Sequence, residues 1–257
     1  MNRAARSLAK RELTRFFRQP HRVVGSLAQP LLIWLFLGYG FNPSFQAPGL
    51  SGISYLEYFY PGILLMLLLF SGIFATITVI EDRAQGLLQE VMAAPVPRSA
   101  IVQGKVAGAM GIALSQSLVL LVAAPFLGLL PGGVNILLIL LGLFIASLGF
   151  TALGLLIAWN MESTAGFHAI MSVFLMPLWM LSGALFPLDH APVWLKGLMV
   201  INPVSHALTL IRRPFYETPE ALLSDPGYGL AMGVALLWAG ICLWLAWRQV
   251  KRVPRGG

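Results

Sequence analysis

The chain has 257 residues, of which 58% are hydrophobic and 11% charged, with a formal net charge of +7 and a mean hydropathy of +0.79. A soluble domain has roughly a quarter of its residues charged, so this composition excludes one and indicates an all-α polytopic membrane protein. Cys242 is the only cysteine, which excludes an intramolecular disulfide and a cysteine-based metal cluster. The four histidines show no i, i+4 pair of the kind that binds zinc.

Residues 1–22 form a basic amphipathic segment that should be a helix lying in the cytoplasmic membrane interface. Its apolar side chains recur near helical spacing, with Arg and Lys on the remaining faces: Ala5, Leu8, Ala9, Leu13, Phe16 and Phe17. Pro20 should stop this helix, because a proline inside a helix removes a backbone hydrogen bond. The alternative is that the segment is only a positive patch that sets membrane topology.

Long stretches without Asp, Glu, Lys or Arg predict six membrane-spanning helices, because about 20 apolar residues cross the hydrocarbon core. One uncharged stretch, 106–161, is too long for a single helix, and Pro131-Gly132-Gly133 divides it. The expected spans are 23–41, 58–80, 106–130, 135–159, 167–187 and 228–247. The first is too long for the apolar core of a usual signal peptide and lacks a clear small-residue cleavage site, so we expect a span there.

The positions of lysine and arginine predict the orientation of these spans. Fourteen of the 17 Lys and Arg residues lie before the first span, between the second and third, or after the last. The other three are Lys196, Arg212 and Arg213. Both termini and the 81–105 loop should therefore be cytoplasmic, and the 188–227 segment external. The net charge of +7 is then explained by topology and anionic lipid rather than by nucleic acid.

Several kinds of chemistry are missing from the sequence. No Asp, Glu, Lys or Arg lies within the expected spans, which disfavours an ion- or proton-coupled carrier. The phosphate-binding pattern G-x-x-x-x-G-K-[ST] does not occur, so active transport would need ATP hydrolysis on a partner chain. One alternative is an intramembrane enzyme acting on lipid or peptide, with His168 and an unspecified serine as its candidates. Another is a passive scaffold subunit.

The 81–105 loop, EDRAQGLLQEVMAAPVPRSAIVQGK, is a polar island between two apolar runs. Its middle predicts a short amphipathic helix that prolines end. Four apolar side chains share one face of this helix: Leu87, Leu88, Val91 and Met92. A helix of two turns is not stable alone. It should therefore pack on its own membrane domain or in a groove of another protein, and the sequence leaves both open.

Two motifs follow one another along the chain. The first lies in the polar loop: Glu81, Gly86, Leu87, Leu88, Glu90, Pro95, Val96, Arg98, Gly104 and Lys105. The second follows the fifth span: Ser182-Gly183, Phe186-Pro187, Pro192, Trp194-Leu195, Asn202-Pro203 and Arg212. With the basic amino-terminal helix and the six spans, the chain resembles the permease subunits of type-2 ABC exporters over nearly its whole length. The drug-resistance and nodulation-factor branch is nearest, and Leu87 departs from that family's small polar residue.

The resemblance implies that residues 1–257 are one domain, the permease of an exporter in the bacterial cytoplasmic (inner) membrane, with no catalytic residue, metal or cofactor of its own. A cytoplasmic ABC ATPase dimer would dock on the 81–105 loop and drive transport. Eight residues would form this docking site: Glu81, Gly86, Leu87, Leu88, Glu90, Val91, Pro95 and Arg98. The apolar spans fit a lipid-like, drug-like or lipid-linked glycan cargo.

A second copy of the permease is expected, because six helices seldom enclose a path wide enough for an amphiphile. The implied assembly is a homodimer in contact with membrane lipid. Gly104 and Gly108 allow close approach of helices, either between two copies or within one.

The external segment 188–227 has apolar patches on both sides of Asn202-Pro203. Its residues alone indicate an interfacial amphipathic segment, whereas the resemblance implies a broken, partly re-entrant helix pair that caps the outer mouth. The gate residues would be Trp194, Asn202, Pro203 and Arg212. We expect the Arg212-Arg213 pair to anchor lipid headgroups rather than to contact an anionic substrate.

Overall fold

The computed structural model describes residues 3–41, 52–129, 134–187 and 191–252, and every regular element in these ranges is helical. Six helices, some built from two segments, are long and apolar enough to cross a membrane. Their bounds are Pro20–Phe41, Tyr55–Ala84, Arg98–Leu127, Ile136–Ala158, Thr164–Ala184 and Pro226–Arg252. The six predicted spans are therefore confirmed as apolar helices, and the largest shift is at the third, which begins at Arg98.

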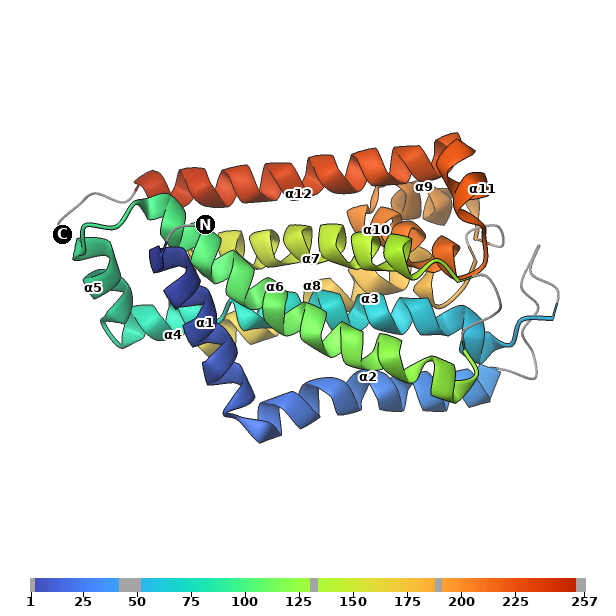
Figure 1. The fold of residues 1–257 in the computed structure, drawn as a ribbon, viewed down its shortest axis with the longest axis horizontal. Coiled ribbons are helices and arrows are strands. Elements are labelled where there is room, and N and C mark those ends of the chain that lie inside the picture. The colour runs from blue at the N-terminus through green and yellow to red at the C-terminus, as the bar shows by residue number, and fades with distance from the viewer. Residues whose placement is uncertain (1–2, 42–51, 130–133, 188–190, 253–257) are drawn as a thin grey trace.

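The spans form one elongated bundle (Figure 1). They are α2 (Pro20–Phe41), α3 (Tyr55–Ala75) with α4 (Thr78–Ala84), α6 (Arg98–Ala123) with η2 (Pro125–Leu127), α7 (Ile136–Ala158), α8 (Thr164–Trp179) with η3 (Met180–Ala184), and α12 (Pro226–Arg252). The start of α6 and the end of α12 lie at the same end as α1 (Arg3–Phe17) and α5 (Leu87–Ala93), which we call the α1 end.

The opposite end, which we call the α10 end, consists of short helices (Figure 1). They are α9 (Val193–Ile201), α10 (Pro203–Arg212), η5 (Arg213–Phe215) and α11 (Pro219–Ser224). The segments predicted to be cytoplasmic and the segment predicted to be external thus lie at opposite ends of the bundle. Which side of a membrane each end faces stays a prediction, as does the re-entrant nature of α9 and α10.

α3 is the central helix of the bundle because it is apolar on every face, and such a helix is stable only when buried. In its most apolar window 83% of the residues are buried, against 17% for α2, 22% for the α8 span and 28% for α12. α3 packs on α2, α6 and α7, and a capping box between Ser54 and Glu57 fixes its start. The large exposed apolar faces of the other three helices suit contact with lipid or with another membrane protein.

α1 lies across α6, where glycines remove the side chains that would separate the two helices. A Cβ atom at Gly104 would lie 2.7 Å from the Leu8 Cβ, and one at Gly108 would lie 2.7 Å from the Glu12 Cβ. Of the two alternatives for this glycine pair, the structure shows packing within one chain. The helix predicted for the amino-terminal segment is confirmed, and it ends before Pro20, the first residue of α2.

At the α1 end the second and third helices extend beyond the predicted spans 58–80 and 106–130, and charged residues lie in these extensions. Asp82 lies in α4, which continues the second span, and Lys105 lies within α6. α6 begins early because Pro97 sits just before its first turn, where a missing N–H removes no helical hydrogen bond. The two side chains pair with each other, the arrangement in which charged groups are tolerated beside apolar helices.

Candidate functional site

Six charged side chains from α1, α4 and α6 meet at the α1 end of the bundle. We call them the ion-pair cluster: Arg11, Glu12, Arg15, Glu81, Asp82 and Lys105. Lys105 Nζ lies 2.7 Å from Glu12 Oε1 and also donates to the Asp82 carboxylate. These three side chains are at most 3% exposed. The cluster therefore joins three separate helices through a buried core of these three side chains, with Arg11, Arg15 and Glu81 partly exposed around it.

Asp82 is the centre of the cluster, since it also accepts from two arginines of α1. Arg11 donates two hydrogen bonds of 2.9 Å to it, the bidentate geometry in which this pair is strongest. The bond to Asp82 raises the pKa of Arg11 above its ordinary value in spite of partial burial. Arg15 lies 3.2 Å from Asp82 Oδ1 and 2.7 Å from Glu81 Oε2. Three bases balance three acids, which lowers the cost of burying Glu12, Asp82 and Lys105.

The sequence patterns do not predict this cluster, because its members are distant in the chain. The Lys105–Glu12 pair is separated by 93 residues and the Arg11–Asp82 pair by 71. One signal is present, since Glu12 is the only acid in the basic segment 1–22. A lone acid on the buried face of a basic helix indicates a cation on a neighbouring element.

The helix predicted within the 81–105 loop is present as α5, and it has one buried and one exposed face. Gly86 precedes it with φ +80°, a conformation that side chains rarely adopt, and so permits the sharp turn from α4. Leu88 is 3% exposed and belongs to the chain's own core, against which Val91 and Met92 also pack. In this structure Leu88 therefore packs within its own chain, and its expected contact with a partner stays a prediction.

The exposed face of α5 and its flanks is polar or small. It consists of Ala84, Gln85, Gln89, Glu90, Ala93, Pro95 and Pro97. Of the predicted docking residues, Glu90 and Pro95 are thus exposed, whereas Gly86, Leu87 and Val91 are half-buried. Glu81 lies in the ion-pair cluster.

Two arginines beside α5 hold the carboxyl ends of other spans. Arg83 donates to the Trp159 and Met161 carbonyls at the end of α7, at 2.6 and 3.0 Å. Arg98 donates to the Val250 carbonyl near the end of α12, at 2.9 Å. Arginine suits these places because the last carbonyls of a helix lack partners and bear partial negative charge. The segment around α5 is thereby joined to α1, α6, α7 and α12.

At the α10 end, the fifth span breaks at Gly183, whose φ is +85°. The break frees backbone carbonyls, and side chains from other helices satisfy them. Arg212 donates to Gly183 O at 2.9 Å and Ala184 O at 3.2 Å, and Tyr58 donates to Gly183 O at 3.1 Å. Asn202 donates to Leu178 O at 2.7 Å. Unpaired carbonyls are costly away from water, so these bonds fix the broken helix to α3 and α10.

Arg212 thus points into the protein, with its guanidinium 4.2 Å from the centre of the Tyr58 ring, and the expected headgroup contact is wrong for this residue. Arg213 is also paired, since it donates to Glu217 at 2.6 Å and to Asp225. Of the predicted gate residues, Asn202 and Arg212 both bind carbonyls around the break in the fifth span. Pro203 begins α10, and Trp194 is 68% exposed on α9.

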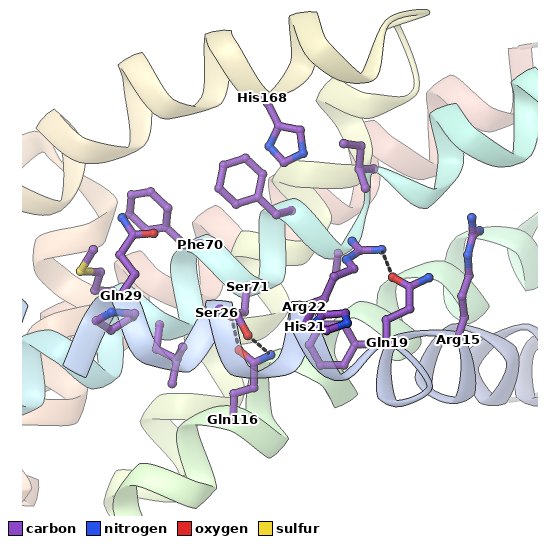
Figure 2. Close-up of a pocket in the computed structure, with 18 of the residues that line it drawn as sticks. Arg15, Gln19, His21, Arg22, Ser26, Gln29, Phe70, Ser71, Gln116 and His168 are labelled. Atoms are coloured by element: carbon purple, nitrogen blue, oxygen red, sulfur yellow. Dashed lines mark hydrogen bonds between the residues drawn. The ribbon is translucent and has the colours of Figure 1, made fainter. Parts of the chain in front are cut away.

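A groove runs between α2 and α8 above the apolar floor of α3, and we call it the α2–α8 groove (Figure 2). The part nearest the α1 end has a volume of about 610 Å³, with polar side chains that include Arg15, Gln19, Arg22, Ser26, Gln116 and His168. The adjoining part, about 730 Å³, is lined by apolar side chains that include Leu32, Phe36, Met176 and Trp179. Gly25 and Gln29 line both parts, so the two are continuous.

Gln116 joins three helices at the floor of this groove (Figure 2). It accepts a hydrogen bond from Ser71 of α3 and donates one of 2.9 Å to Ser26 of α2. His168 packs its ring 4.7 Å from that of Phe74, and no hydrogen bond among the described residues joins it to a serine. Within the same residues, no group of three or more His, Cys, Asp or Glu could hold a metal ion.

The fold and the ion-paired end define a polytopic helical membrane protein, and comparison with known proteins gives its family. Residues 3–216 match the model of the family described as ABC-2 type transporter. The chain belongs to this family of permeases, which makes it the membrane transport subunit of an ABC transporter rather than an enzyme, and implies association with an ABC ATPase subunit.

Individual relatives agree with this assignment. The chain is 28% identical to a putative transport permease, ycf38, of Cyanophora paradoxa over 80% of its own length and 71% of the relative's. It is 25% identical to Nodulation protein J of Sinorhizobium fredii, over 84% and 79% of the two chains. It is 27% identical to the probable multidrug ABC transporter permease YbhR of Escherichia coli, over 64% of this chain and 45% of that one.

Proposed function

We propose that this chain is the permease of an exporter that moves a lipid-like, drug-like or lipid-linked glycan cargo outward across the bacterial cytoplasmic membrane. Its family supports the transport role, and the description of one relative as a multidrug permease supports a drug-like cargo. The α1 end faces the cytoplasm in this proposal, in keeping with the positive-inside bias. α9 and α10 form the outer gate, with Asn202 and Arg212 holding the broken fifth span.

A cytoplasmic ATPase dimer docks on the exposed face of α5. The observation that supports this site is the division of α5 into two faces, because Leu88 anchors it to the bundle while Gln89 and Glu90 lie in solvent. A short helix that is anchored on one side and exposed on the other suits a partner's groove. The partner then contacts a polar surface that has one acidic residue. The leucines of α5 contribute by holding the helix on its own bundle.

Movement of α5 reaches the spans through the bonds on both sides of it. Asp82 is hydrogen-bonded to α1 and α6. Arg83 is hydrogen-bonded to the end of α7, and Arg98 to the end of α12. Because α-helices satisfy their own backbone bonds, they move as rigid rods when their ends are displaced. ATP-driven closure of the ATPase dimer thereby changes the tilt of several spans together.

The working unit is a homodimer in contact with membrane lipid. Large apolar side chains cover the outer faces of α2, α8 and α12, among them Phe36, Val173 and Leu237, which are 73%, 69% and 66% exposed. A second copy that faces the first covers part of this surface and widens the path beyond what six helices enclose. Membrane lipid covers the rest.

Charge reversal on α5 tests the docking site. In Glu90→Arg, co-purification of a co-expressed ABC ATPase with the tagged chain and ATP-driven export should both fall about tenfold, as expected for the loss of one favourable charged contact. Glu220→Arg is the matched control, because Glu220 is an exposed acid on α11 at the α10 end. Full ATPase association and export in Glu90→Arg would exclude docking on this face.

A further inference from the structure

α1 has a second, strongly basic groove on the side of the helix that does not pack on the bundle, and we call it the α1 groove. Its volume is about 530 Å³, and its lining residues are Ser7, Lys10, Arg11, Thr14, Arg15, Arg18 and Gln19. The buried face of α1 is made of other residues, which are Ala5, Ala9, Glu12 and Phe16. The groove thus combines several basic and neutral polar side chains and has no acidic one.

The basic side chains of the α1 groove differ in whether acids balance them. Arg11 and Arg15 belong to the ion-pair cluster, in which bases and acids are equal in number. Lys10 and Arg18 take part in none of the ion pairs of the described residues, and both are exposed. The groove therefore has two positive charges that no neighbouring acid balances.

The two unbalanced cations lie on either side of a hydroxyl. Lys10, Thr14 and Arg18 follow one another at intervals of four residues, which places them in one row along the helix. The Arg18 N–H bonds to the Thr14 carbonyl at 3.1 Å, so the helical spacing extends to the end of the row. The row is about 12 Å long at 1.5 Å per residue, short enough for both long cationic side chains to converge on one anion above Thr14.

Arg11 and Arg15 connect this row to the ion-pair cluster. Arg11 binds Asp82 through its two terminal nitrogens, and Arg15 binds Asp82 and Glu81 in the same way. A guanidinium has five N–H donors in a fixed plane, so each arginine keeps donors for an acceptor on its other side. Since both side chains also line the α1 groove, an anion there shares its arginines with Asp82.

The α1 groove ends where the first membrane-spanning helix begins. Gln19 is its last lining residue and directly precedes Pro20, the first residue of α2. Phe17 and Val24, on the two sides of this point, are apolar and 52% and 65% exposed. Such side chains suit the hydrocarbon edge of a bilayer, which places the cationic row level with the lipid headgroups. Clusters of Lys and Arg beside a span attract anionic lipid.

We propose that the α1 groove binds the phosphate of an anionic phospholipid, which Lys10, Thr14 and Arg18 hold and which Arg11 and Arg15 connect to the ion-pair cluster. The bound phosphate balances the two excess cations and strengthens the attachment of α1 to α4 and α6. The lipid composition of the bilayer therefore determines how firmly α1 is held. A zwitterionic headgroup binds less well, because the four basic side chains repel its quaternary ammonium. Inorganic phosphate has the same acceptor oxygens but no tails to lie beside Phe17.

Titration of the full chain in dodecyl maltoside micelles tests the site. The probes are phosphatidylglycerol, phosphatidylcholine with the same tails, and inorganic phosphate, and the readouts are Tm and hydrogen exchange. Phosphatidylglycerol should raise Tm and slow exchange at residues 3–17, with a half-saturating concentration about tenfold below that of phosphatidylcholine. Equal responses to the two lipids overturn the proposal. An equal response to inorganic phosphate at the same concentration assigns the groove to a soluble anion and overturns it too.

Paired charge variants separate this groove from the general positive charge of the α1 end. Lys10→Gln with Arg18→Gln should raise the half-saturating concentration of phosphatidylglycerol about 25-fold, because each cation near an anionic surface contributes about a factor of five. Lys251→Gln with Arg252→Gln is the matched control. It removes the same charge from two exposed residues at the end of α12, outside the groove. Equal weakening by the two pairs shows diffuse surface binding and overturns the proposal.

Variants at the centre of the row test where the phosphate lies. Thr14→Glu puts a carboxylate four residues from both Lys10 and Arg18, where it pairs with them in place of the lipid. This variant should fold and should lose the response to phosphatidylglycerol. Thr14→Gln, a neutral side chain of the same size, should keep most of the response. An undiminished response in Thr14→Glu overturns the proposal.

A protein partner on the same face of α1 gives a different result. If Lys10→Gln with Arg18→Gln reduces co-purification of the ATPase but leaves phosphatidylglycerol binding unchanged, the groove is a protein contact and the proposal fails. The titration itself contains neither ATPase nor cargo, so the lipid site and the proposed function stand or fall separately.

Discussion

The two ends of the bundle are held together by different kinds of bond. At the α1 end, charged side chains of α1, α4 and α6 bind one another, and Asp82 alone has three cationic partners. At the α10 end, the side chains of Tyr58, Asn202 and Arg212 bind backbone carbonyls that the break in the fifth span exposes. An acid with several cations can exchange partners as helices move. A freed carbonyl in a bilayer has few alternatives.

These two kinds of bond indicate that the α1 end is the one suited to movement. In the proposed mechanism, the α1 end is displaced by the ATPase and keeps its charges paired throughout. The α10 end stays assembled and determines where the fifth span is broken. Substitutions at each end should therefore differ in size and in the kind of compensation that restores stability.

The largest effect is expected from Lys105→Met. It removes the buried cation 2.7 Å from the Glu12 carboxylate and leaves only Arg11, at 3.5 Å, beside that buried acid. Loss of one member of a buried pair lowers the free energy of unfolding by about 3–5 kcal/mol. Asp82 retains its two arginines, so Glu12→Gln in the same chain should recover a large part of the loss. Denaturant unfolding of the detergent-solubilised protein, arranged as a double-mutant cycle, measures both. A strictly additive double variant would contradict the role of the pair.

Arg212→Met should have the next largest effect, about 1.5–3 kcal/mol, because it removes the charged donor to two freed carbonyls. Unlike at the α1 end, no second substitution should restore stability, since the acceptors belong to the backbone. Unfolding and hydrogen exchange at residues 180–185 measure this. Unchanged exchange there would show that Arg212 does not hold the break.

Gly104→Ala should lower the unfolding free energy by about 1–3 kcal/mol through overpacking of α1 on α6. The added Cβ would lie 2.7 Å from that of Leu8 and 3.0 Å from the Ala5 carbonyl oxygen. Gly240→Ala is the control, because a Cβ there meets nothing within 4 Å. Alanine should stabilise α12 by about 0.5–1 kcal/mol. Equal effects of the two substitutions would show that α1 does not pack closely on Gly104.

The smallest effect on stability is expected from lowering the pH, which protonates Asp225 at the α10 end. The hydrogen bond from Arg213 lowers the pKa of Asp225 below its ordinary value of 3.8. A depressed pKa contributes stability that is present above pH 4 and is lost as pH falls through the folded-state value. The stability difference between the wild type and Asp225→Asn should thus be constant from pH 7 to 5 and shrink below pH 4. A difference that grows in acid would contradict the pairing with Arg213.

The sequence predicts those parts of the fold that depend on local pattern. Six long apolar runs give the spans, and glycine and proline place α5 within the 81–105 loop. The direction in which Leu88 points is not predicted, because an amphipathic helix of two turns fits its own bundle and a partner's groove equally well.

Pairings between residues that are distant in the chain also cannot be predicted from the sequence. Glu12 and Lys105 look like solvated charges until α1 is known to cross α6 on Gly104 and Gly108. Arg212 looks like a headgroup anchor until the break at Gly183 is seen to expose carbonyls that it can bind. In both cases the partner is created by the tertiary fold.

The Asp82–Lys105 pair has a consequence for how the chain is made. These two residues are 23 apart, so they leave the ribosome within moments of each other and flank one helical hairpin. A hairpin that enters the lipid with its acid and base already joined presents no net charge from this pair during insertion. α1, synthesised earlier, then only has to fold down onto a pair that is already in place. The buried charges thus suit an order of biogenesis in which the central hairpin inserts first and the amino-terminal helix closes over it.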